Sequence, residues 1–206
     1  MEEKREAPIK AVIFDSGGVL ERDSDRAVIY HILRKFGVPP VAALKELQNL
    51  VPLLEVGRLS EEDFWRKFSA KCGKPLPKNW AELFREPYVK NFKAIEGTLD
   101  IARELRNRGC KIGVLSNTIA AHDHPKKQKM FGEFQGVVLS YASGVRKPEK
   151  QAYLAVVDLL GVKPEEAVHV DNEPRFVEAA KKAGLHGVLF KNPSQLRREL
   201  RKMRVL

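Results

Sequence analysis

The amino-acid sequence predicts an α/β fold in which a parallel sheet carries an inserted group of helices. From about residue 94 onward, short apolar runs alternate with amphipathic stretches, as strands and helices do in such domains. The runs are almost continuously apolar, which is typical of strands covered on both faces. A segment of about 70 residues that reads as helices only interrupts this alternation after the first run. We therefore expect a core over residues 1–21 and 94–206 and a helical subdomain over 22–93.

Five apolar runs are predicted to be buried strands. Each is too short for a helix, and four contain paired β-branched or aromatic residues. The runs cover residues 11–14, 112–115, 137–139, 167–170 and 187–190.

Helical periodicity fills the spaces between these runs. Residues 98–108, 149–160 and 176–183 place apolar side chains at helical spacing and are followed by Gly109, Gly161 and Gly184. The basic stretch 191–206 has the pattern of an amphipathic helix packed on the core. Within the insertion, Ser24 or Asp25 is expected to start a helix that Gly37 ends, and the capping-box pattern at residues 60–63 starts another.

Composition excludes several classes of protein. The chain is 43% hydrophobic and 31% charged, which rules out a disordered or fibrous protein. No run of about eighteen apolar residues predicts a membrane span. Its two cysteines cannot build a disulfide framework and its first ten residues are mostly charged, so we expect a cytoplasmic location.

The net charge of +10 favours an anionic ligand. The sequence has no nucleic-acid-binding motif and no interleaving of basic and aromatic residues. Charge alone does not choose between nucleic acid, a membrane surface and phosphorylated metabolites, which are all anions. On the motifs described below we expect a small phosphorylated substrate, with no nucleic-acid or membrane partner. The oligomeric state is left open.

Polar side chains follow four of the predicted strands. Because the carboxyl ends of parallel strands meet at one edge of a sheet, we expect these side chains to share a cleft. They are Asp15 after the first strand, Ser116 and Asn117 after the second, Lys147 after the third, and Asp171, Asn172 and Glu173 after the fourth.

This set of side chains suits covalent transfer of a phosphoryl group. A carboxylate attacks phosphorus, a lysine and a hydroxyl hold the equatorial oxygens, and a divalent cation offsets the repulsion between the two anions. Gly17 and Gly18 permit a tight turn whose backbone N–H groups approach an anion closely. We expect this loop, Ser16 included, to bind the substrate together with Asn117.

The ordered motifs F-D-S-G-G-V, S-N-T, G-V-R-K-P and D-N-E resemble those of the haloacid dehalogenase-like (HAD) hydrolase superfamily over nearly the whole chain. The likeness is greatest to a branch that includes sugar-phosphate phosphatases. It implies a Rossmann-like core with a helical cap inserted after the first motif. It also implies that Asp15 is the nucleophile and forms an aspartyl-phosphate, that Ser116 donates to the phosphoryl group, and that Lys147 neutralises charge.

The resemblance further implies a Mg²⁺ ion held by Asp15, by the backbone carbonyl of Gly17 and by the fourth motif. There the family's metal-binding Asp falls on Asn172, which offers an oxygen without a charge. Asp171 fills the preceding acidic position and is expected to touch the metal or its water shell, and Glu173 could contribute through water. His122 follows the S-N-T motif at the spacing of this branch and is expected near the substrate.

The sequence departs from the family at Gly17, where phosphatases commonly carry a second Asp that acts as a general acid and base. Such help is worth about 10²–10⁴ in rate. Asp23 is a candidate substitute, with helix capping as its other interpretation. Arg146 is expected on the surface, whereas Glu55 and Arg58 are each assigned either to the cleft or to the surface.

These observations favour a Mg²⁺-dependent phosphatase of a small phosphorylated metabolite, with a sugar phosphate as one candidate. Two alternatives stay open. A 2-haloacid dehalogenase would use the same Asp15 on carbon without a metal. A HAD-like protein without activity would bind a phosphometabolite or a protein partner.

Overall fold

The computed structural model describes residues 7–38 and 40–206, so residues 1–6 of the predicted core lie outside it. At its centre is a parallel sheet of five strands in the order β3-β2-β1-β4-β5. This arrangement confirms the predicted fold class, and each predicted strand is present to within one residue at either end. The strands are β1 (Ala11–Phe14), β2 (Lys111–Ser116), β3 (Gly136–Leu139), β4 (Ala167–Asp171) and β5 (His186–Leu189).

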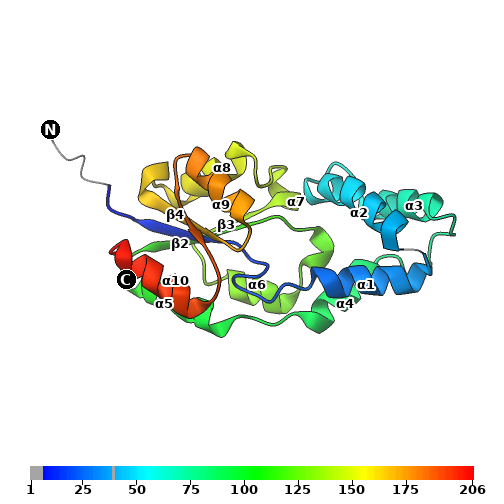
Figure 1. Ribbon diagram of the computed structural model, residues 1–206, viewed down its shortest axis with the longest axis horizontal. Helices are drawn as coiled ribbons and strands as arrows, with labels where there is room; N and C mark the ends of the chain where they lie inside the picture. The colour runs from blue at the N-terminus through cyan, green and yellow to red at the C-terminus, as the bar shows by residue number, and fades with distance from the viewer. Residues whose placement is uncertain (1–6, 39) are drawn as a thin grey trace.

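Helices cover both faces of the sheet (Figure 1). Val12 and Phe14 of β1 pack on one side with the first group of helices, whereas Ala11 and Ile13 pack on the other with the second group. This is why the first strand is apolar at every position. The first group is α5 (Glu96–Asn107), α6 (Pro125–Phe131) and α10 (Pro193–Lys202), and the second is α8 (Lys150–Leu160) and α9 (Pro174–Lys182).

Three short helical turns connect these elements at the sheet's edges. They are η1 (Ala120–His122), α7 (Ser140–Ser143) and η2 (Pro164–Glu166). The predicted C-terminal amphipathic helix is α10, whose Leu196 and Leu200 are fully buried.

Four helices form a separate layer beyond the carboxyl ends of the strands (Figure 1). They pack in two pairs, α1 with α4 and α2 with α3. Aromatic side chains build a core of their own there, with Phe36 stacked on Trp65 and edge-on to Phe68. The helices are α1 (Asp25–Phe36), α2 (Pro40–Glu55), α3 (Glu61–Lys71) and α4 (Glu82–Asn91).

Local signals explain where this helical layer begins and where its helices end. Gly37 adopts a left-handed conformation that ends α1, and the N–H of Asp63 donates to the Ser60 hydroxyl at the start of α3. Glu21 and Ala94 pair in a short antiparallel bridge where the chain leaves and re-enters the core. We propose the cap over residues 22–93 on the strength of this bridge. Across the described ranges, none of the helices has the length and apolarity that crossing a bilayer requires.

Candidate active site

The predicted chemistry gathers at the carboxyl ends of the strands. Asp15 follows β1, Ser116 ends β2 and Lys147 precedes α8, and all three line one polar cleft of about 190 Å³. The central position of β1 places Asp15 between the residues that follow its two neighbouring strands. Of the other predicted site residues, the cleft is also lined by Gly17, Asn117, His122 and Asn172.

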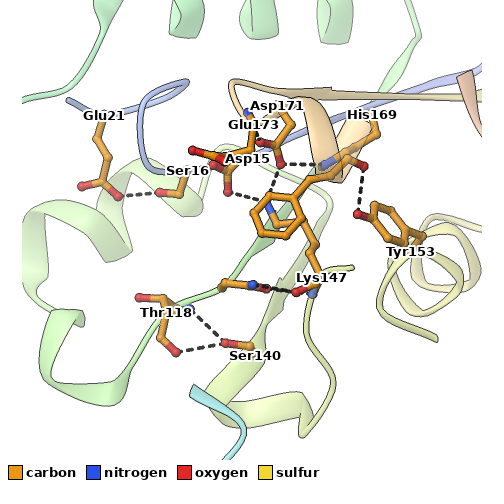
Figure 2. Close-up of polar contacts among 12 residues, drawn as sticks. Asp15, Ser16, Glu21, Thr118, Ser140, Lys147, Tyr153, His169, Asp171 and Glu173 are labelled. Atoms are coloured by element: carbon orange, nitrogen blue, oxygen red, sulfur yellow. Dashed lines mark hydrogen bonds and ion pairs between the residues drawn. The ribbon is translucent and has the colours of Figure 1, made fainter. Parts of the chain in front are cut away.

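Lys147 joins two carboxylates inside the protein (Figure 2). Its Nζ donates to Asp15 Oδ1 at 2.8 Å and to Asp171 Oδ2 at 2.6 Å. The side chain is 1% exposed, and its ammonium lies 4.8 Å from the ring centre of Phe176. Two carboxylates thus face a single buried ammonium. Lys147 orients Asp15, but its one positive charge does not balance the negative charges of Asp15 and Asp171.

Burial and charge act differently on the three groups. Burial raises the pKa of Asp15, and the Asp171 carboxylate adds to that rise while Lys147 opposes it. Burial also disfavours the charged form of Asp171, but His169 and Lys147 outweigh it and hold the pKa of Asp171 below its usual range. Burial disfavours the ammonium too, yet Asp15 and Asp171 keep the pKa of Lys147 above its ordinary value.

Asp171 is saturated by protein donors. Besides Lys147, its Oδ2 lies 3.0 Å from His169 Nε2, and its Oδ1 accepts from the N–H of Glu173 at 2.9 Å. The carboxylate is fully buried and does not line the cleft. In this arrangement Asp171 holds Lys147 and does not lie in the cleft where the metal was expected, and the residues of the fourth motif that line the cleft are Asn172 and Glu173.

Asn117 holds the backbone of Lys147. Its side-chain amide donates to the carbonyl of Lys147 at 2.9 Å, and its oxygen accepts from the Lys147 N–H at 2.8 Å. The neighbouring Thr118 is held in the same way, because Ser140 Oγ bonds both its N–H and its carbonyl (Figure 2). The S-N-T segment therefore fixes the segment that carries Lys147, a role that the sequence did not indicate.

The first loop divides its residues between two roles. Ser16 is fully buried, and its hydroxyl donates to Glu21 at 2.5 Å rather than toward the cleft (Figure 2). Gly18 does not line the cleft either. Its φ is +80°, and a Cβ there would lie 2.6 Å from Asn172 Nδ2. Glycine at this position therefore allows both the turn and the close approach of Asn172.

A second buried polar cluster was not predicted. Glu21 accepts from Tyr88 of α4 at 2.7 Å and pairs with Lys127 of α6 at 3.0 Å, and Lys127 also donates to the Tyr88 hydroxyl. The cluster ties the nucleophile loop to the cap and the core. One signal was present in the sequence, because Lys127 lies three and four residues before Met130 and Phe131, on the buried face of its helix.

His122 lines the cleft and stacks on Tyr88, with ring centres 3.9 Å apart. Burial lowers the pKa of His122 to about 3, and Lys127 and His124 add to the effect, so the ring is neutral at neutral pH. Its Nε2 is buried and has no hydrogen-bond partner within the described ranges. The contact of His122 with a substrate stays a prediction.

The interpretation of Arg146 as a surface residue is wrong. Its side chain is 26% exposed, lines the cleft and pairs with Glu55 of α2 at 2.8 Å. Burial raises the pKa of Glu55, and Arg146 opposes that rise. Arg58 is exposed and does not line the cleft. Asp23 lies at the rim, where its carboxylate accepts from the N–H of Asp25.

Comparison with known proteins identifies the family of this chain. The profile of the haloacid dehalogenase-like hydrolases matches residues 9–184. The chain therefore belongs to the haloacid dehalogenase-like hydrolase family and is a hydrolase by that membership, as its motifs indicate.

Individual relatives are distant but extend over almost the whole chain. Flavin mononucleotide hydrolase 1 of Arabidopsis thaliana is 26% identical, over 96% of this chain and 78% of its own length. Phosphatase MT3486 of Mycobacterium tuberculosis is 26% identical, over 92% of this chain and 90% of its own length. A HAD family enzyme of Bacteroides thetaiotaomicron, solved with magnesium and inorganic phosphate, has a TM-score of 0.71 at 22% identity. The match covers 89% of this chain and 95% of that enzyme's chain. The structural likeness shows the fold.

The donor set of the cleft fits a hard divalent cation. Asn172 Oδ1 is buried and accepts no hydrogen bond from the residues that the structure describes. Asp15 and Gly17 line the same cleft, as the prediction of a ligand set made of a carboxylate, a backbone carbonyl and Asn172 requires. No group of three His, Cys, Asp or Glu side chains in residues 7–38 and 40–206 forms a metal site, so the set relies on amide and carbonyl oxygens, which Mg²⁺ accepts.

Proposed function

We propose that this hydrolase is a Mg²⁺-dependent phosphatase that cleaves the phosphate ester of a small metabolite through an aspartyl-phosphate on Asp15. The observation that carries the proposal is the buried contact of Lys147 with Asp15 at the rim of a polar cleft. A phosphate ester brings negative charge to this point, and the lysine is already oriented there. The names of two relatives, a flavin mononucleotide hydrolase and a phosphatase, support the same chemistry.

The reaction has two steps. An oxygen of Asp15 attacks phosphorus, the bond from phosphorus to the alcohol oxygen breaks, and the leaving oxygen takes a proton from solvent, to which the water consumed in the second step returns one. Water then attacks the phosphorus of the acyl phosphate and releases inorganic phosphate and the Asp15 carboxylate. Lys147 stabilises the charge of the transferred group, and the Ser116 hydroxyl, at the end of β2, donates to its oxygens.

Asp15, Gly17 and Asn172 would hold the cation, whose charge offsets the repulsion between the carboxylate and the phosphate. Asn172 contributes an oxygen without a charge, while Asp171 acts through Lys147. His122 supplies a neutral ring nitrogen at the cleft wall. Gly17 carries no acid, so a leaving group that is itself acidic is expected to react fastest.

The test is phosphate release from p-nitrophenyl phosphate and a panel of phosphate esters, with Mg²⁺ and with EDTA. We expect Asp15→Asn to lower kcat at least about 10⁴-fold, because the amide is not a nucleophile. Asp158→Asn makes the same chemical change at an exposed position of α8 and serves as the control. EDTA is expected to abolish turnover, and added Mg²⁺ to restore it.

Other results would contradict the proposal. Halide release from 2-chloropropionate that resists EDTA would assign the site to carbon chemistry. Absence of Asp15-dependent turnover across the panel would assign the cleft to binding alone. Equal rates for Asp15→Asn and Asp158→Asn would exclude Asp15 as the nucleophile.

A further inference from the structure

A second, larger cavity lies beside the polar cleft, inside the helical layer. Its volume is about 570 Å³, within the range of pockets that enclose small organic ligands. It lies between α1 and α2, which belong to different helix pairs of the cap. We call it the cap chamber. Its walls come from Val28, Ile29 and Ile32 of α1 and from Leu44, Leu47 and Val51 of α2.

Most of the wall that α1 and α2 give to the cap chamber is apolar, whereas polar and charged side chains line the side that it shares with the cleft. Phe84 and Ile119 add to its walls, and Gln48 is the one uncharged polar side chain of the two flanking helices that lines it. Ile29 and Val51 are only partly buried although they belong to the cap core. A sugar would place several hydroxyl groups against these walls without partners, which is costly.

The cap chamber is continuous with the cleft. Asp25, Glu55, Arg146 and Arg175 line both cavities, so the charged residues form the boundary between the polar and the apolar space. Asn117 and His122 line both as well. A phosphoryl group bound next to Asp15 therefore directs the alcohol portion of its ester through this boundary toward α1 and α2.

We propose that the cap chamber binds the alcohol portion of the substrate and that this portion is hydrophobic. The substrate class is then a phosphate monoester of an alkyl or aryl alcohol, rather than a sugar phosphate. This inference rests on the proposed phosphatase function and narrows it. Arg146 and Arg175 contact the charged end of such a molecule, and the apolar walls select its remainder.

The test measures kcat/KM for ethyl, butyl, hexyl and octyl phosphate, with glycerol 3-phosphate and glucose 6-phosphate as polar substrates. Because each buried methylene is worth about fourfold in binding, we expect kcat/KM to rise by about that factor per methylene until the chamber is filled. The two polar esters are expected to react no better than ethyl phosphate. A polar ester that exceeds octyl phosphate, or a flat alkyl series, would overturn the inference.

A matched pair of variants locates the effect. Leu44→Trp places an indole in the cap chamber and is expected to lower the ratio of kcat/KM for octyl over ethyl phosphate at least about tenfold. Leu53→Trp makes the same change on α2 at a position that is 39% exposed and does not line the chamber, and it is expected to keep the wild-type ratio. Equal ratios in the two variants would place the apolar site elsewhere.

Binding measured without turnover separates this inference from the proposed function. Calorimetric titration with ethylphosphonate and octylphosphonate is expected to show much tighter binding of the octyl compound to the wild type but not to Leu44→Trp. If octylphosphonate binds no tighter, the chamber does not hold the substrate, whatever the activity. If sedimentation shows a dimer that Leu44→Trp dissociates, the chamber belongs to a second copy of the chain and the inference fails. Absence of Asp15-dependent turnover would instead contradict the phosphatase function.

Discussion

Two lysines in residues 7–38 and 40–206 are buried, and they differ in the charge that surrounds them. Lys147 and Lys127 are 1% and 4% exposed. Lys147 lies between two carboxylates, Asp15 and Asp171, whereas Lys127 pairs with one, Glu21. The cluster of Lys147, Asp15 and Asp171, the first cluster, therefore keeps a surplus of negative charge. The second cluster, Lys127 with Glu21 and Tyr88, is balanced.

This difference in charge indicates a reactive role for the cluster around Lys147 and a structural role for the cluster around Lys127. The surplus charge next to Asp15 favours a cation in the cleft, and it contributes to the raised pKa of Asp15. The balanced cluster needs no further ion, because Ser16, Tyr88 and Lys127 donate to Glu21 or to one another. A buried charge without a partner is unstable unless a ligand supplies the opposite charge. We therefore expect the cluster around Lys147, and not the cluster around Lys127, to bind a cation.

Removing Lys147 is expected to have the largest effect. Lys147→Met removes the ammonium that pairs with two buried carboxylates, Asp15 and Asp171, so the free energy of unfolding should fall by about 3–5 kcal/mol. The rate should fall by a further 10²–10³-fold, roughly the loss expected when one donor to a developing charge is removed. Urea denaturation and phosphate release measure the two effects. Near wild-type turnover in the folded variant would show that Lys147 is structural.

Removing Lys127 is expected to cost similar stability with a smaller loss of rate. Lys127→Met leaves Glu21 buried without its cation, again at about 3–5 kcal/mol. The rate should fall by less than about 10²-fold, because only the position of the nucleophile loop changes. Glu21→Gln in the same chain should restore part of the stability. If the double variant is less stable than Lys127→Met, the two clusters do not differ as described.

Adding charge to the first cluster is expected to strengthen metal binding. Asn172→Asp replaces a neutral ligand oxygen next to Asp15 by a carboxylate of nearly the same size, so the apparent Kd for Mg²⁺ should fall about tenfold. Without Mg²⁺ the same change should lower the melting temperature, because it adds to the negative surplus. Mg²⁺ titrations of activity and of thermal unfolding provide two readouts. An unchanged Kd would show that Asn172 does not face the ion.

The smallest effect expected is that of Gly18→Ala. Gly18 and Gly144 both have positive φ, at +80° and +74°, so alanine at either position should cost about 1–2 kcal/mol of stability. A Cβ at Gly144 meets nothing within 4 Å, whereas one at Gly18 collides with Asn172. Only Gly18→Ala should therefore weaken Mg²⁺ binding as well. Equal Mg²⁺ affinity in the two variants would contradict the contact.

The sheet and the residues at its carboxyl edge were predictable from the sequence. Each strand is a short apolar run, and Asp15, Ser116 and Lys147 each follow one, so parallel pairing alone brings them together. Which oxygen faces the cleft was not predictable. Asp171 and Asn172 are neighbours in the chain, and only the side-chain hydrogen bonds show that the first is occupied by Lys147.

The second cluster could not be predicted, for a different reason. Glu21 and Lys127 look like surface residues, since isolated charges are rarely buried. Their partner Tyr88 lies 67 residues beyond Glu21, in the cap. The pairing of Arg146 with Glu55 likewise depends on where α2 meets the core, and no local pattern in the sequence indicates that position.

The central place of β1 has a consequence for how the chain is made. Both strands that flank β1 come late, β2 at residue 111 and β4 at residue 167. Asp15 meets Lys147 only 132 residues later in the sequence. At ribosomal speed this gap lasts roughly 10 s, during which the Asp15 carboxylate lacks its ammonium partner. The first strand, although made first, therefore completes its pairing on both sides only when the last third of the chain is being translated.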